Sequence, residues 1–191
     1  LSDILPESFF KWYRSFSAPL PEDLNRYLSP EKSFIDIGAG NGFFLSKIVA
    51  TKNISALEIA DTKIAYLKNH FPGILVYRDI FALDRTFDVV ACIDVLHHIE
   101  DSELRDVFID KMCAIVSERG VLIIKEMRDD VPLHMYFNRL SDFVSTGSRT
   151  NEMNQEKLQR TLIKNGLSIK KIEKYTSFLY GHYYLIAQKN D

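Results

Sequence analysis

The stretch Phe34-Ile35-Asp36-Ile37-Gly38-Ala39-Gly40-Asn41-Gly42 decides the fold of this chain. It predicts a short buried strand followed by a turn with glycine at every second position. Residues 43–49 that follow, Phe-Phe-Leu-Ser-Lys-Ile-Val, have the pattern of a helix. Because glycine lacks a Cβ and tolerates positive φ, a ligand can approach the backbone of the turn closely. The N–H groups that start a helix would add donors, so the unit predicts a site for a nucleotide-like ligand.

The spacing of the glycines indicates which nucleotide is expected. The dinucleotide fingerprint G-x-G-x-x-G, counted from Gly38, requires a third glycine at position 43, where this chain has Phe43. The run D-x-G-x-G-x-G instead resembles motif I of the class I S-adenosylmethionine (SAM)-dependent methyltransferases. The rest of the chain must support this resemblance, because a lone glycine pattern is weakly specific.

Composition places the chain among ordinary globular proteins. Its 191 residues fit one domain, and its net charge of −2 argues against a strongly polyphosphate-binding surface. The two cysteines, Cys92 and Cys113, are expected to be buried and reduced, with no disulfide or zinc-type cluster. The sequence shows no bilayer-spanning apolar run and no signal-peptide pattern, so the expected location is cytoplasmic and no membrane partner is expected.

Strand and helix patterns alternate after the glycine turn, which predicts a doubly wound parallel sheet of the Rossmann-like α/β class. The helix expected over residues 100–117 has Leu104, Val107, Phe108, Met112 and Ile115 at inward positions. The expected strands are residues 54–59, 74–77, 87–94 and 121–126, and the expected helices are 61–70 and 100–117.

The C-terminal part has a different pattern. Residues 152–165 predict a helix that ends at Gly166, and residues 169–175 and 178–188 predict two strands. No crossover helix fits between these strands, so they must be antiparallel. A seven-stranded, mostly parallel sheet closed by a C-terminal antiparallel hairpin is the fold that the methyltransferase resemblance implies, over about residues 33–189.

The residues before the first strand form a separate helical segment in this reading. Residues 7–16 have an aromatic helical pattern, and Pro21 suits the first turn of a second short helix that runs to Tyr27. Residues 1–32 are therefore expected to be a lid over the cofactor or a helix packed on the sheet, and both readings stay open. Residues 33–191 are expected to be the SAM-binding domain.

Four expected strands end in an acid: Asp36, Glu58, Asp79 and Asp94. The carboxyl ends of parallel strands meet at the edge of the sheet where ligands bind. SAM carries a net positive charge and a dinucleotide a negative one, so acids at this edge favour SAM. Each acid alone could instead cap the next helix.

The resemblance implies a role for each matching residue along the cofactor. The turn lies beneath the ligand, the acid after the second strand takes the ribose hydroxyls, and the acid after the third strand takes the adenine amino group. The expected cofactor-binding residues are Asp36 near the amino-acid end, Gly38, Ala39, Gly40 and Gly42 in the turn, Glu58 at the ribose, Ile59, Asp79 and Ile80 at the adenine, and Asp94 and Val95 on the methionine side.

Two adjacent histidines follow the fourth strand. The segment Asp94-Val95-Leu96-His97-His98-Ile99 looks like the Leu-His-His segment of many small-molecule methyltransferases. Either histidine could take a proton from the acceptor, because imidazole titrates near neutrality, or could only hydrogen-bond the loop. Their spacing matches no standard zinc pattern, so no metal is expected.

The acceptor site is expected between the fifth strand and the next helix. Residues 127–150 are the longest stretch that the basic fold does not require, and their substrate candidates are His134, Tyr136 and Arg139. An extra helix that packs Met135 and Phe137 into the core would explain most of the apolar residues instead.

The favoured function is transfer of a methyl group from SAM to a small-molecule acceptor by in-line displacement. A nucleic-acid partner is disfavoured, because Asp94-Val95-Leu96-His97 replaces the Asn/Asp-Pro-Pro-aromatic tetrad of amino-methylating enzymes. An RNA-directed enzyme that methylates carbon or ribose, a non-catalytic SAM-binding regulatory subunit and a dehydrogenase remain alternatives. The sequence predicts neither the acceptor nor the oligomeric state.

Overall fold

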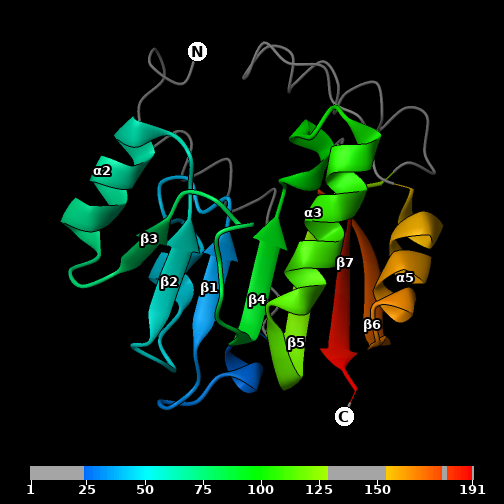
Figure 1. The fold of residues 1–191 in the computed structure, drawn as a ribbon, viewed down its shortest axis with the longest axis horizontal. Helices are drawn as coiled ribbons and strands as arrows, with labels where there is room; N and C mark the ends of the chain where they lie inside the picture. Colours follow the sequence, from blue (N-terminus) through cyan, green and yellow to red (C-terminus); the bar gives the residue numbers. More distant parts are fainter. Residues whose placement is uncertain (1–23, 129–153, 178–179, 191) are drawn as a thin grey trace.

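One seven-stranded mixed sheet organises the chain in the computed structural model, which describes residues 24–128, 154–177 and 180–190 (Figure 1). Its strand order is β3-β2-β1-β4-β5-β7-β6, and the predicted Rossmann-like class is confirmed. The first five strands in that order are parallel, whereas β7 is antiparallel to both of its neighbours. The strands are β1 (Phe34–Ile37), β2 (Ile54–Leu57), β3 (Leu75–Tyr77), β4 (Phe87–Ile93), β5 (Val116–Met127), β6 (Leu167–Ser177) and β7 (Tyr180–Lys189).

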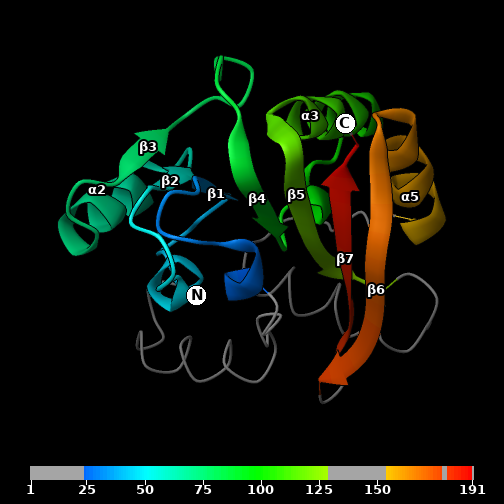
Figure 2. The ribbon, with the colours of Figure 1, turned by 90° about the horizontal axis from the view of Figure 1, so that it is seen from below.

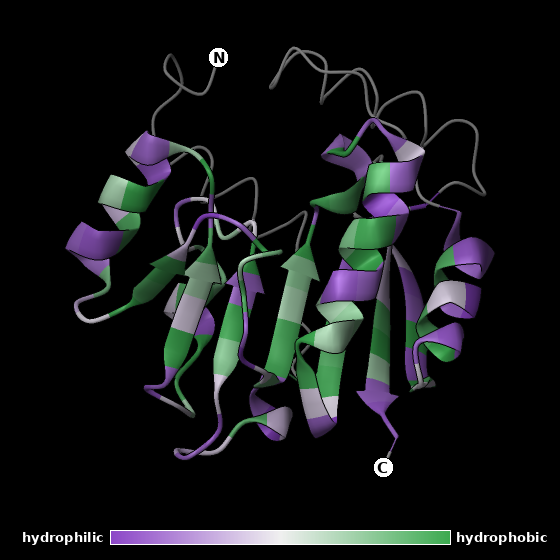
Figure 3. Cartoon of the chain, viewed as in Figure 1, coloured by the Kyte–Doolittle hydropathy of each residue, from purple (hydrophilic) through white to green (hydrophobic). Residues whose placement is uncertain are grey.

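Helical elements lie on both faces of this sheet. Helices α3 and α5 cover one face of its β4-β5-β7-β6 half, and η1 and η2 lie on the opposite side (Figure 2). Apolar residues fill the strands while polar residues face outward on α5 (Figure 3), so the core has two layers, one on each side of the sheet. The helical elements are η1 (Leu24–Tyr27), η2 (Leu45–Lys47), α2 (Asp61–His70), η3 (Leu96–His98), α3 (Ser102–Ala114) and α5 (Gln155–Lys164).

The chain reverses its direction of travel across the sheet next to β1. From β1 it moves outward to β2 and β3, and then it returns to place β4 on the other side of β1. The carboxyl ends of β1 and β4 therefore flank the switch in strand order, which is where open α/β sheets bind ligands. The glycine turn and the loop after β4 both leave the sheet at this point.

The helix predicted over residues 43–49 is wrong. The structure has a turn and then the three-residue 3₁₀ helix η2, and the backbone is already extended at Ile48. The side chain of Asn25 donates to the carbonyl of Lys47 at 3.1 Å and accepts from the N–H of Val49 at 3.4 Å. These contacts occupy backbone groups that a longer helix would pair internally, so a tertiary contact ends the helix after one turn.

Helix α3 is shorter than predicted, and it turns a different face to the core. Leu104 and Val107, expected inward, are about half exposed at 50% and 52%, whereas Arg105 and Ile109 are buried. The carboxylate of Asp101 accepts from two N–H groups of the first turn and sets where the helix begins. Met112 and Ile115 are buried as predicted, and Phe108 is partly buried.

Other predicted elements agree with the structure within a few residues. Helix α2 has the predicted bounds, and β6 and β7 form the predicted antiparallel hairpin. Strand β5 begins at Val116, ahead of Gly120, and the predicted helix before Tyr27 is the 3₁₀ helix η1. Gly166 has a φ of 79° just after α5, as a helix-ending glycine should.

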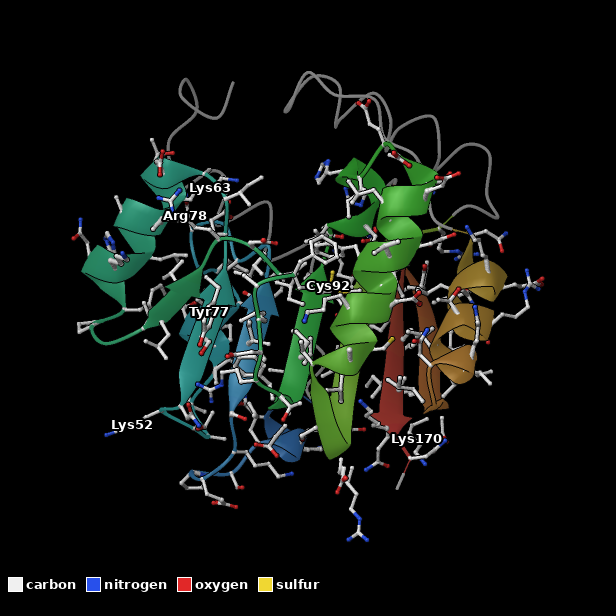
Figure 4. All side chains as sticks on the ribbon, viewed as in Figure 1. Lys52, Lys63, Tyr77, Arg78, Cys92 and Lys170 are labelled. Carbon is white, nitrogen blue, oxygen red and sulfur yellow. The ribbon has the colours of Figure 1, made fainter. Side chains whose placement is uncertain are left out.

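Both cysteines are buried and free, as predicted, and Cys92 lies in the middle of the sheet on β4 (Figure 4). Burial raises the pKa of both thiols, that of Cys113 to about 12. Within the described ranges, no helix combines the length and the apolar composition that a bilayer crossing requires.

Candidate cofactor-binding site

The glycine turn after β1 has the backbone conformation that its sequence predicts. Gly38, Gly40 and Gly42 have φ angles of 73°, 57° and 72°, which side-chain-bearing residues rarely adopt. A Cβ on Gly38 would lie 2.5 Å from Cγ2 of Val95, and a Cβ on Gly42 would lie 2.4 Å from the ring of Phe71. The turn therefore packs against the loop after β4 on one side and the end of α2 on the other.

Glu58 connects the end of β2 to the glycine turn. Its Oε2 accepts from the N–H of Gly40 at 2.8 Å, and its Oε1 accepts from the N–H groups of Ile59 and Ala60 at 2.8 and 3.0 Å. The residue is only 6% exposed. An ionised carboxylate offers about four acceptor positions, so roughly one position is left for a ligand hydroxyl. A second hydroxyl would have to displace the Gly40 amide.

The residues predicted for the adenine differ in exposure. Ile59 is 74% exposed beside the buried Glu58, and Asp79 is exposed in the turn after β3. Asp79 Oδ1 accepts from the N–H of Phe81 at 2.9 Å. The side chain of Ile80 is only 2% exposed and belongs to the core, so only its backbone is open to a ligand.

Basic side chains lie beside this end of the site. Lys63 projects from α2 near Arg78, which follows β3 (Figure 4). Arg78 forms an exposed ion pair with Asp61 at the start of α2. The acids at the strand ends are therefore partly balanced by cations at the β2–β3 side.

Asp36 and Asp94 lie toward the middle of the sheet. Asp36 is 1% exposed and lies inside β1 rather than after it. Asp94 follows β4 with a φ of 56°, and its Oδ2 is ion-paired with the buried Lys125 of β5. Burial opposes ionisation of Asp94, but the positive charge of Lys125, followed by that of His182, lowers its pKa to about 2. Asp94 Oδ1 is buried without a hydrogen-bond partner in the described chain.

His97 is held by a buried acid that the sequence analysis did not connect with it. His97 Nδ1 donates to Oε2 of Glu126 at 2.6 Å, and both side chains are 1% exposed. Glu126 Oε1 also accepts from the N–H groups of Val95 and Leu96, at 3.1 and 2.7 Å. The loop-holding role left open for His97 is therefore present in the structure.

His98 has a different environment. It is exposed, and its ring lies 4.1 Å from that of His97, centroid to centroid. Partial burial, followed by the neighbouring charge of His97, lowers the pKa of His98 to about 4. His98 is therefore neutral at pH 7, with an imidazole nitrogen that can accept a proton.

Lys125 and Glu126 are functional candidates that the sequence analysis missed. Their signal is in the sequence: two charged residues end an otherwise apolar strand, Val121-Leu122-Ile123-Ile124-Lys125-Glu126. Tyr184 lies directly opposite Lys125 in the β5–β7 register and is also buried. Only the sheet register shows which residues these charges meet.

Other predicted site residues lie outside the described residues. They include the substrate candidates His134, Tyr136 and Arg139, and residues 1–23 of the lid predicted over residues 1–32. In the part of the chain that is described, no three His, Cys, Asp or Glu side chains form a group that could hold a metal ion.

A sequence family described as a methyltransferase domain matches residues 9–172. The chain belongs to this methyltransferase family. The match spans most of the 191 residues, so it confirms the resemblance to class I SAM-dependent methyltransferases and SAM as the cofactor. It also decides against the dehydrogenase alternative. A search of curated protein sequences gives no significant match.

Solved structures with the same fold support this assignment. Magnesium protoporphyrin IX methyltransferase from Synechocystis PCC 6803, with bound S-adenosylhomocysteine (SAH), is 15% identical to the methyltransferase described here, covers 96% of this chain and 94% of its own, and has a TM-score of 0.66. The N-methyltransferase NodS from Bradyrhizobium japonicum, also with SAH, is 16% identical over 84% and 79%, with a TM-score of 0.64. A SAM-dependent methyltransferase from Methanosarcina mazei is 17% identical over 90% and 98%, with a TM-score of 0.70. At these identities the likeness concerns the fold.

Proposed function

We propose that this chain transfers the methyl group of SAM to a small-molecule acceptor by in-line displacement. The conformation of the loop after β4 is the observation that favours a small-molecule acceptor over nucleic acid. Leu96 and His97 are 0% and 1% exposed there, and the charge of Glu126 is used to hold the loop. Enzymes that act on an extruded base stack it between aromatic or apolar side chains. Residues 94–99 contain no Phe, Tyr or Trp, and the only ring exposed among them is the imidazole of His98.

The residues at the carboxyl edge of β1, β2 and β4 fit the cofactor. The three left-handed glycines make a tight turn at the switch in strand order, and exposed Ile59 offers an apolar surface for a base. Asp94 Oδ1, buried without a partner in the described chain, is matched by a ligand with a hydrogen-bond donor such as an ammonium group. We assign Glu58 to the ribose, Asp79 to the adenine, and Asp94 with Val95 to the methionine side.

Two further assignments complete the cofactor site. Buried Asp36 gives negative charge beneath the amino-acid end, with Gly38, Ala39, Gly40 and Gly42 as the floor of the site. Ile80 contributes only through its backbone, because its side chain is in the core.

The chemistry asks the protein mainly for placement. When bound, SAM supplies a methyl group that its sulfonium already activates. The chain's own residues orient the donor, hold the acceptor in line with it and exclude water. The acids around the site favour a positively charged ligand, and Glu58 and Glu126 fix the two loops that flank it.

The enzyme needs a general base only if the substrate atom that receives the methyl group carries a proton. His98 is exposed and neutral at pH 7, so it is the candidate base of the two histidines. His97 is buried and bonded to Glu126, so its first role is to hold the loop. The substrate candidates His134, Tyr136 and Arg139 remain proposals.

The relatives of similar fold are consistent with a small-molecule acceptor. One of them is named for magnesium protoporphyrin IX, which is a small molecule. We extend that acceptor class to this chain. We also propose a cytoplasmic location, as the sequence analysis expects.

A labelled-methyl assay tests the proposal. The purified chain is incubated with methyl-labelled SAM and a panel of small amines, phenols, thiols and carboxylates, and with total RNA and DNA in parallel. We expect label to be transferred to a small molecule and not to nucleic acid. Label in RNA would favour the RNA-directed alternative, and SAM binding without transfer to any acceptor would favour a regulatory subunit.

A further inference from the structure

Two consecutive buried positions near the end of β5 carry charges that the fold alone does not require. Lys125 is 1% exposed and Glu126 is 0% exposed, and because they are consecutive in a strand they point to opposite faces of the sheet. Burying a charge is costly unless it is well paired, and an apolar pair of similar volume is often equally stable. These two buried charges therefore point to a role other than stability.

Lys125 holds the first residue of the loop after β4. Its ammonium group forms an ion pair with Asp94, and its backbone carbonyl accepts from the N–H of Asp94 at 3.0 Å. Asp94 has a φ of 56°, a conformation that costs a side-chain-bearing residue free energy and persists only when its surroundings impose it. The two contacts with Lys125 are the surroundings that impose it.

Glu126 holds the next three residues of the same loop. Its two carboxylate oxygens accept from Val95 N, Leu96 N and His97 Nδ1 at 3.1, 2.7 and 2.6 Å. Leu96 and His97 are buried, so these hydrogen bonds are shielded from water. Charge-assisted hydrogen bonds in such surroundings are stronger and more directional than neutral ones.

The held loop in turn contacts the glycine turn. The side chain of Val95 lies so close to Gly38 that even a methyl group on Gly38 would overlap it, at 2.5 Å. The position of residues 94–97 therefore sets the spacing between the loop after β4 and the turn after β1. These two segments flank the switch in strand order.

We propose that Lys125 and Glu126 act as a clamp that fixes residues 94–97 against the glycine turn and so presets the methionine end of the cofactor site. They are positioning residues, because they act through Asp94, Val95 and His97. The inference rests on the proposed function for its ligand. The clamp itself is a property of this chain with or without the ligand.

The test uses two clamp variants and one matched control on the same strand. Glu126→Gln keeps the volume but replaces one accepting oxygen with a donor, and Lys125→Met removes the buried charge. Ile124→Val removes one methyl group from the core beside them and leaves the ion pair and hydrogen bonds of Lys125 and Glu126 in place. Each purified protein is measured for its melting temperature, for its SAH affinity by calorimetry, and for the ring ¹⁵N signals of His97 without ligand, assigned with His97→Asn.

The expected results separate positioning from stability. Both clamp variants should bind SAH at least about tenfold more weakly than wild type, as loss of a buried charged hydrogen bond implies. Ile124→Val should bind within about twofold of wild type even if its melting temperature falls equally, since the lost contact is only apolar packing. In wild type, Nδ1 of His97 should carry the proton, and Glu126→Gln should shift its signal. The melting temperatures identify any variant that does not fold. If one clamp variant does not fold, the SAH affinity of the other clamp variant tests the proposal.

Two results would overturn the clamp. One is wild-type SAH affinity in both folded clamp variants, and the other is an unchanged His97 signal in Glu126→Gln. If wild type itself did not bind SAH, the proposed function would fail instead. The His97 signal, which needs no ligand, would then decide alone whether the clamp exists.

Discussion

Gly38 and Val95 are in van der Waals contact across the gap between the turn after β1 and the loop after β4. A Cβ at Gly38 would lie 2.5 Å from Cγ2 of Val95, which is closer than real Cβ atoms come to any heavy atom. This contact joins the segment that identifies the fold to the segment that carries both candidate histidines. It also makes the glycine necessary for two separate reasons, its φ of 73° and the lack of space.

Gly38→Ala should therefore lower the free energy of unfolding by about 2–4 kcal/mol, with strain from φ and overlap both contributing. Gly73→Ala is the matched control, because Gly73 has a φ of 83° but no atom within 4 Å of a Cβ. It should cost only about 1–2 kcal/mol, the strain alone.

Urea unfolding of Gly38→Ala, Gly73→Ala, Val95→Ala and Gly38→Ala/Val95→Ala measures the two parts. In the double variant the overlap is removed, so the coupling between positions 38 and 95 should be favourable by about 1 kcal/mol or more. Equal losses in Gly38→Ala and Gly73→Ala would show that the contact with Val95 has no energetic weight.

Glu58→Gln should weaken both the fold and cofactor binding. The carboxylate accepts three backbone N–H groups, and an amide in its place turns a donor toward some of them. We expect a loss of about 1–3 kcal/mol in unfolding free energy and a weaker SAH affinity. Exposed Glu118, which follows the start of β5, gives a charge-matched control as Glu118→Gln. Wild-type stability in Glu58→Gln would contradict the role of Glu58 in holding the turn.

Asp79→Ala should weaken cofactor binding but leave the stability of the fold almost unchanged. Asp79 is exposed, and its hydrogen bond to Phe81 N closes only its own turn. The unfolding free energy should fall by no more than about 1 kcal/mol, whereas SAH affinity should fall about tenfold if the carboxylate takes the adenine amino group. Calorimetry beside urea unfolding checks both quantities. Unchanged SAH affinity would remove Asp79 from the site.

His98 should make the fold less stable in acid. Its folded pKa of about 4 lies below the ordinary value of about 6.5, so the unfolded chain binds more protons between these values. The stabilising contribution of neutral His98 is complete above about pH 6.5 and is lost as the pH falls toward 4. Carboxylates titrate in part of this range, so the informative quantity is the difference between wild type and His98→Gln. If both lost stability in parallel from pH 7 to 4, the lowered pKa would be wrong.

The sheet and its acids were predictable because their signals are local. Each buried strand is a short apolar run, and Glu58 and Asp94 come directly after such runs, so their common edge follows from the βαβ rhythm. The helix predicted over residues 43–49 failed because Asn25, far away in sequence, captures the backbone groups that would continue it. The buried face of α3, which carries Arg105, Ile109 and Met112, is set by how the helix packs on the sheet, and the local apolar pattern does not contain that information.

The clamp could not be predicted for a related reason. Lys125 and Glu126 were visible as charges at the end of an apolar strand, but their partners depend on the register between β4 and β5. The structure pairs Glu126 with His97 and two backbone amides, and its place in the sequence does not indicate these contacts. Sequence patterns give the types of residue at an edge of a sheet, and the register gives their contacts.

Calorimetric titration of the wild-type chain with SAH, SAM and NAD tests the central claim most directly. The glycine turn, bonded to Glu58 and with acids at the neighbouring strand ends, is expected to bind the sulfonium and its demethylated product and to reject the dinucleotide. The account predicts saturable binding of SAH and SAM at one site per chain and no heat with NAD. Preferential binding of NAD, or no binding of SAH to the folded chain, would contradict it.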